Sequence, residues 1–60
     1  MKVQVMVLKV KESKNSKFYE KDRARLLDRP AMEKLADLAA AGIRIGCEIK
    51  VELQEMEVFE

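Results

Sequence analysis

The sequence predicts a single small α+β domain, residues 1–60, in which one helix packs on a short antiparallel sheet. Three observations support this fold class. Residues 43–53 alternate apolar and polar side chains, residues 2–12 carry apolar side chains at both parities, and the segment after Pro30 repeats its apolar residues at helical spacing. Period two is typical of a strand, and a spacing of three and four is typical of a helix.

Residues 2–12 are expected to form a central strand. Val3, Val5 and Val7 would lie on one face, and Met6, Leu8 and Val10 on the other. A strand that is apolar on both faces is usually buried in the middle of a sheet. A helix would cover one face, but so short a chain has difficulty covering the second. This strand therefore predicts a homodimer or a partner surface.

Two interpretations are open for residues 18–28, which follow a polar break at residues 12–17. The break fits a hairpin tip with a loop of about four or five residues. Continuity of the hairpin and the join at Arg29-Pro30 favour a strand, whereas the abundance of Glu, Lys, Arg, Ala and Leu favours a helix. We expect the strand, which gives the order ββαβ; the alternative order is βααβ.

Pro30 is expected in the first turn of the helix, with Asp28 or Arg29 just outside it. The apolar stripe of this helix is Met32, Leu35, Ala36 and Ala39. Gly42 is the expected residue after the helix end, where a positive φ is common.

The last strand would then span residues 43–53. Its alternating apolar residues are Ile43, Ile45, Cys47, Ile49, Val51 and Leu53. Met56 and Val58 have the opposite parity, which predicts either a bulge near Gln54 or departure of the chain from the sheet. With the helix crossing back over the sheet, the expected spatial order is second strand, first strand, last strand. Both outer strands would then be free edges.

The composition argues against an enzyme. The chain has no histidine, a single cysteine and no glycine-rich loop, so we expect no metal, no cofactor and no small-molecule substrate. Cys47 is in phase with aliphatic residues and is expected to be a buried, unreactive thiol. No apolar run is long enough to span a membrane. We expect a cytoplasmic protein, in the host cell cytoplasm if it is viral.

Charge is distributed unequally along the chain. Residues 1–30 carry nine Lys and Arg against four Asp and Glu, and residues 31–60 carry three against seven. The halves therefore have net charges of +5 (9 − 4) and −4 (3 − 7). These charges would either pair across neighbouring strands or form a basic surface with a separate acidic tail at Glu55, Glu57 and Glu60.

The basic stretch is the candidate site for nucleic acid. Its residues are Lys9, Lys11, Lys14, Lys17, Tyr19, Lys21, Arg23 and Arg25. Cations neutralise phosphates, and an exposed ring stacks on an unpaired base. On the strand interpretation, Tyr19 would share one face with Lys21, Arg23 and Arg25, beside Lys9 and Lys11. The alternative is that Phe18 belongs to the core, Tyr19 is a half-buried anchor and the lysines keep the protein soluble.

The order of the "MKVQVMVLKV" strand, a Ser/Lys loop and "KFY" resembles the start of the single-stranded DNA-binding proteins of filamentous phages. The resemblance implies an OB-like β-barrel that works as a dimer, and it implies strand-binding roles for Lys14, Lys17 and Tyr19. The expected function is a small non-enzymatic binding protein of phage or mobile-element type that contacts single-stranded DNA. The alternative is a protein–protein interaction module, such as a phage-encoded inhibitor or adaptor of a host protein.

Overall fold

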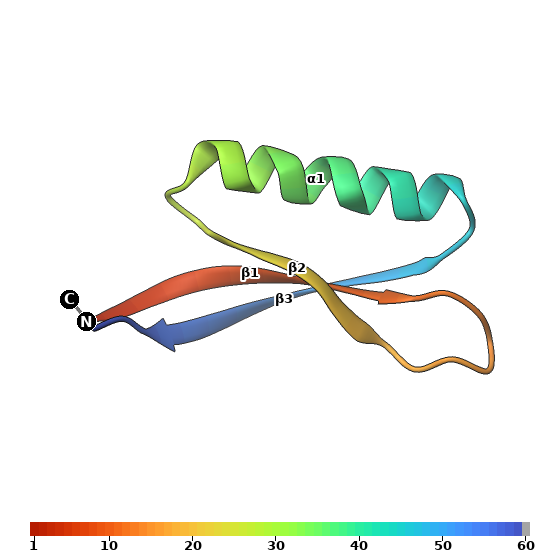
Figure 1. Ribbon diagram of the computed structural model, residues 1–60, viewed down its shortest axis with the longest axis horizontal. Helices are drawn as coiled ribbons and strands as arrows, with labels where there is room; N and C mark the ends of the chain where they lie inside the picture. The colour runs from red at the N-terminus through yellow and green to blue at the C-terminus, as the bar shows by residue number, and fades with distance from the viewer. Residues whose placement is uncertain (60) are drawn as a thin grey trace.

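The computed structural model describes residues 1–59 and has the element order ββαβ (Figure 1). Its elements are β1 (Lys2–Lys11), β2 (Tyr19–Arg25), α1 (Arg29–Arg44) and β3 (Glu48–Glu57). The strands form one antiparallel sheet in the order β2-β1-β3, and α1 lies along one face of it (Figure 1). The predicted fold class and strand order are confirmed. The βααβ alternative and the OB-like barrel are wrong, because residues 19–25 are a strand and the sheet is open with a helix on it.

The core lies between α1 and the sheet. Leu8 and Val10 of β1, Ala24 of β2 and Leu35 of α1 are buried together. Partly buried side chains surround this cluster, namely Met6, Ala31, Met32, Leu38, Ala39, Cys47 and Ile49. The central position of β1 therefore follows from its apolar residues, as predicted.

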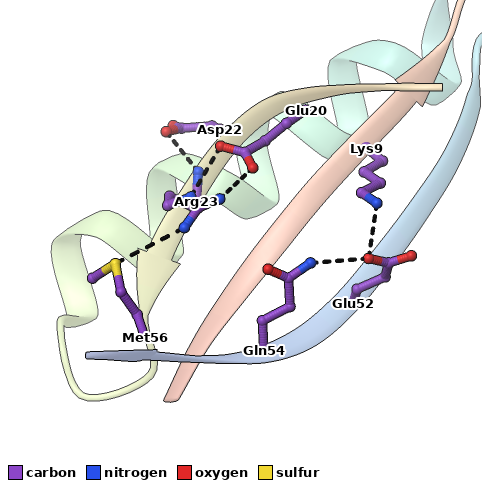
Figure 2. Close-up of polar contacts among 7 residues, drawn as sticks. All are labelled: Lys9, Glu20, Asp22, Arg23, Glu52, Gln54 and Met56. Carbon is purple, nitrogen blue, oxygen red and sulfur yellow. Dashed lines mark hydrogen bonds and ion pairs between the residues drawn. The ribbon is translucent and has the colours of Figure 1, made fainter. Parts of the chain in front are cut away.

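The sheet face away from α1, called here the open face, is covered by the chain's own long side chains. Val5 and Val7 are only 1% and 0% exposed there. Arg23 of β2 reaches toward Met56 of β3, with Nη1 3.9 Å from Sδ (Figure 2). The aliphatic parts of long polar side chains can shield apolar neighbours in this way. The expectation that this face lacks cover was wrong, and the argument for a homodimer through it loses its premise.

Of the two residues expected just outside the helix, Asp28 is the N-cap of α1, and its Oδ1 accepts a hydrogen bond from the Ala31 amide at 3.2 Å; Arg29 is already in the helix. The predicted helix end at Gly42 was wrong, since α1 continues to Arg44. Gly46, with φ +89°, is the residue that turns the chain. Its amide donates to the Ile43 carbonyl at 3.1 Å, and the Cys47 amide donates to the Gly42 carbonyl at 2.9 Å. This is a Schellman motif, in which a left-handed glycine closes the helix.

The strand predicted for residues 43–53 consequently begins only at Glu48. Ile43 lies in the last turn of the helix and Ile45 is its C-cap, and both are largely exposed. Gly42 is buried because α1 approaches β3 closely there: a Cβ on Gly42 would lie 2.8 Å from Ile49 Cδ1. The glycine that we assigned to the helix end therefore serves close packing.

β3 continues without interruption past Leu53. Its register against β1 runs from Lys11↔Glu48 to Lys2↔Glu57 with no shift. The predicted bulge near Gln54, or departure from the sheet, was wrong. The change of parity instead places Met56 on the open face, where it pairs with Val3.

Candidate nucleic-acid interface

A hydrogen-bonded turn organises the tip of the β1–β2 hairpin. The Ser16 amide donates to the Ser13 carbonyl at 3.2 Å, and the Ser16 hydroxyl donates to the same carbonyl at 2.9 Å. The Ser13 amide donates to Ser16 Oγ at 2.9 Å. Lys14 and Asn15 occupy the two central positions of this turn. The whole connection spans residues 12–18 and is longer than the predicted four or five residues.

A β-bulge in β2 divides the predicted binding face. Glu20 pairs with Lys9 and Asp22 pairs with Leu8, so Lys21 has no partner in β1. Residues directly opposite each other share a face of the sheet. Tyr19, opposite Val10, is therefore on the side of α1.

Arg23 and Arg25 lie on the other side of the sheet from Tyr19. They are opposite Val7 and Val5, which belong to the open face. The prediction that Tyr19, Arg23 and Arg25 share one face was wrong, because one extra residue reverses the direction of every side chain beyond it.

Two aromatic rings are exposed next to the turn. Phe18 and Tyr19 are each 40% exposed. The Lys11 ammonium lies over the Phe18 ring, 6.0 Å from its centroid, which is within the range of a cation–π contact. The Tyr19 hydroxyl donates to Glu12 Oε1 at 2.9 Å, and this hydrogen bond raises the pKa of Tyr19.

Phe18 was absent from the predicted site, and the alternative that placed it in the core was wrong. The available signal was its position between Lys17 and Tyr19, in a polar connection where no core residue was required. The Phe18 ring and Lys11 lie beside the hairpin turn, outside the core cluster under α1, and Lys14 and Lys17 belong to the same connection. This group, Lys11, Lys14, Lys17, Phe18 and Tyr19, is called here the hairpin site.

Two of the predicted cations have carboxylate partners on the open face. Lys9 Nζ lies 3.0 Å from Glu52 Oε2, and Arg23 forms an ion pair with Glu20 (Figure 2). Residues three apart on a regular strand point to opposite faces, so the bulge at Lys21 is what allows Glu20 and Arg23 to meet. Arg23 holds the pKa of Glu20 below its usual value.

The remaining predicted cations have no ion-pair partner among residues 1–59. They are Lys11, Lys14, Lys17, Lys21 and Arg25. The expected pairing of opposite charges across neighbouring strands is confirmed for Lys9 of β1 with Glu52 of β3. Glu55 and Glu57 belong to β3 rather than to a separate acidic tail, and Glu60 lies outside the described residues.

A hollow of about 580 Å³ lies at the end of the sheet opposite the hairpin tip. It is lined by Met1, Lys2, Val3, Gln4, Arg25, Leu26 and Leu27.

Cys47 is half-buried against the core. Within residues 1–59, no three His, Cys, Asp or Glu side chains gather in a way that could hold a metal ion. No helix in the same range has the length and apolar character to cross a membrane.

These features define a small α+β domain, a three-stranded antiparallel sheet with one helix, in which five cations of the β1–β2 hairpin have no ion-pair partner among the described residues. Comparison with protein-family models, with curated proteins and with solved structures finds no significant match for the chain.

Proposed function

We propose that this chain is a small non-enzymatic protein of phage or mobile-element type that binds single-stranded nucleic acid, with single-stranded DNA favoured, through the hairpin site. The observation that carries the proposal is the grouping of two exposed rings, Phe18 and Tyr19, with Lys11, Lys14 and Lys17 at one end of the sheet. None of these three lysines has an ion-pair partner within the described chain. Their charges are therefore available to phosphates.

The proposed contacts divide into two kinds. A ring that stacks on an unpaired base contributes about 1 to 3 kcal/mol and tolerates any base. Each phosphate that a lysine neutralises on a single strand adds about 0.7 to the slope of log affinity against log salt. Binding through the hairpin site is therefore expected to be independent of sequence and strongly dependent on salt.

Lys9 and Arg23 have a smaller part in this proposal than in the prediction from sequence. Each already faces a carboxylate, so a phosphate would have to compete with Glu52 or Glu20. Arg23 also covers the buried valines of the open face, which explains its presence without a ligand. Lys21 and Arg25 have no such partner and extend the basic surface along β2.

The first test measures binding of a fluorescent oligothymidine to the full chain by anisotropy at low salt. Phe18→Leu removes the ring but keeps an apolar side chain, and we expect it to weaken binding about 5- to 150-fold. Lys17→Ala should weaken binding and reduce the salt slope by about 0.7. Lys34→Ala removes the same charge from the exposed face of α1 and is expected to leave affinity unchanged.

Circular dichroism must show that each variant remains folded. Absence of binding at low salt, or binding whose affinity does not respond to salt, contradicts the proposal. Equal losses in Lys17→Ala and Lys34→Ala would also contradict it, because they would mean that net charge rather than the hairpin site determines affinity.

A protein–protein interaction module is the second candidate, and the hollow at the other end of the sheet favours it. Leu27 is fully exposed at its rim, next to Leu26 and Val3. β1 extends beyond the end of β2 here, and the Leu26 amide, bonded to the Gln4 carbonyl at 3.2 Å, is the last backbone link between them. This function predicts salt-resistant capture of one host protein that Leu27→Ser abolishes and Phe18→Leu leaves intact.

A further inference from the structure

β3 is a long and regular free edge of the sheet. Its ten residues pair with β1 on one side, and no described strand pairs with the other. An exposed edge strand presents a row of unpaired backbone groups, which is a template for another strand. Proteins usually blunt such edges with proline, bulges or short length, and β3 has none of these.

Apolar side chains accompany this edge. Val51 and Leu53 pair with Leu8 and Met6, so they lie on the face that carries α1. They are nevertheless 50% and 58% exposed, because α1 leaves this part of β3 uncovered. The occupant of the edge must therefore supply apolar side chains on the helix side of the sheet.

Charged side chains alternate with these apolar ones on the open face of β3. Lys50 and Glu52 lie side by side there, with Lys50 Nζ 3.2 Å from Glu52 Oε1. One cation and one anion separated by a single residue form a self-complementary pattern. An antiparallel copy of the same strand can place each of them opposite its counter-charge.

We propose that a second copy of this chain pairs with β3 in an antiparallel manner, with Val51 opposite the partner's Val51. In this register Lys50 faces the partner's Glu52, and Ile49 faces the partner's Leu53. The apolar residues meet on the helix side, and the opposite charges meet on the open face. The product is a homodimer with one continuous six-stranded sheet and both α1 helices on the same side of it.

Neighbouring registers are less favourable for the same sequence. If the partner strand slides by two residues in one direction, Glu52 lies opposite the partner's Glu52. If it slides by two residues in the other direction, Lys50 lies opposite the partner's Lys50. Directly opposed like charges are destabilising. A shift that changes parity brings the apolar row of one strand onto the face of the charged row of the other. The charges of Lys50 and Glu52 therefore select one register.

The test is a charge-reversal experiment read by sedimentation velocity over a range of micromolar concentrations. Lys50→Glu gives two Glu–Glu pairs across the homodimer, and Glu52→Lys gives two Lys–Lys pairs. Each variant alone is expected to self-associate about 5- to 30-fold more weakly than the natural chain. An equimolar mixture of the two restores both opposite-charge pairs in a heterodimer and should recover the association.

The controls are Lys34→Glu and Glu33→Lys, which make the same changes of charge on exposed positions of α1. They should leave self-association unchanged. Leu53→Gln, which removes an apolar contact without changing charge, should weaken it. Circular dichroism checks folding, since Glu52→Lys also loses the ion pair with Lys9.

A natural chain that remains a monomer throughout this range overturns the proposal. A dimer that resists Lys50→Glu and Leu53→Gln, or a mixture that stays as weak as the single variants, also overturns it. Those last results would assign the association to another surface or another register.

Discussion

The two edges of the sheet differ in regularity and in charge. β2 has seven residues, is interrupted by the bulge at Lys21 and continues from the basic hairpin site. β3 has ten residues in unbroken register, with apolar and charged side chains in alternation. Bulges are a usual means of preventing a strand from pairing at an edge. β2 is therefore blocked to another strand and lies beside unpaired cations, whereas β3 is open to a strand.

The two proposals follow this difference. Nucleic acid is assigned to the hairpin site beside β2, where charge dominates, and a second copy is assigned to β3, where backbone pairing and apolar contact dominate. The two surfaces lie on opposite sides of β1 in the sheet order β2-β1-β3. A variant at one edge can therefore be used as a control for the other.

Salt concentration should separate the two edges by the largest effect. If the three lysines of the hairpin site neutralise about three phosphates, the slope of log affinity against log salt is about −2, and affinity falls roughly 20-fold between 50 and 200 mM salt. Self-association through β3 includes only two exposed pairs of opposite charge and should change by a few-fold at most. Anisotropy and sedimentation in matched buffers measure both. Equal responses to salt would contradict the assignment of different ligands to the two edges.

Gly46 determines where β3 starts, so its substitution should affect the β3 edge before the hairpin. Gly46→Ala places a side chain at φ +89° and should lower the free energy of unfolding by about 1 kcal/mol. In a domain of this size that corresponds to a fall in Tm of about 4 to 8 °C.

Gly46→Asn is the matched control for this effect, because asparagine tolerates the left-handed region better than alanine. It should be measurably more stable than Gly46→Ala in thermal unfolding followed by circular dichroism. An alanine variant as stable as the natural chain would contradict the role of Gly46 in closing α1.

Acid should remove a small contribution to the free energy of unfolding that comes from Glu52 and its partners on β1 and β3. Hydrogen bonds from Lys9, Lys50 and Gln54 lower the pKa of Glu52 from 4.5 to about 2. A carboxyl whose pKa is lowered by folding stabilises the folded state above its unfolded pKa, and the contribution is lost as the pH falls toward its folded pKa.

Glu52→Gln removes this titration. The difference in Tm between the natural chain and Glu52→Gln should be constant above about pH 5 and shrink steadily between pH 4.5 and pH 2. A difference that does not vary with pH would mean that Glu52 makes no favourable ion pairs in the folded chain.

The sequence was sufficient to predict the fold because β1 is apolar at both parities and the helix has a proline-led start. It was insufficient at the join between α1 and β3. Ile43 and Ile45 fit the alternation of the following strand, yet Ile43 also continues the helical stripe, four residues after Ala39. The choice between Gly42 and Gly46 as the helix end depended on tertiary packing, since only the structure places Gly42 against Ile49.

The candidate site was predicted less well than the fold, for a related reason. Alternation along β2 assumed a regular strand, and no residue near Lys21 signals a bulge, which commonly involves glycine. The bulge then decided the direction of Tyr19 and brought Arg23 to Glu20. Cover for Val5 and Val7 was also missed, because a count of apolar residues ignores the aliphatic stems of long polar ones.

Amide hydrogen exchange followed by NMR at increasing protein concentration tests the difference between the two edges most directly. Half of the amides of an edge strand point away from its neighbour and exchange quickly unless another strand pairs with them. We predict that the outward amides of β3 around Val51 become protected as concentration rises, while the outward amides of β2 remain unprotected. Protection that appears on β2, or on neither strand at concentrations where the chain is dimeric, would contradict the account.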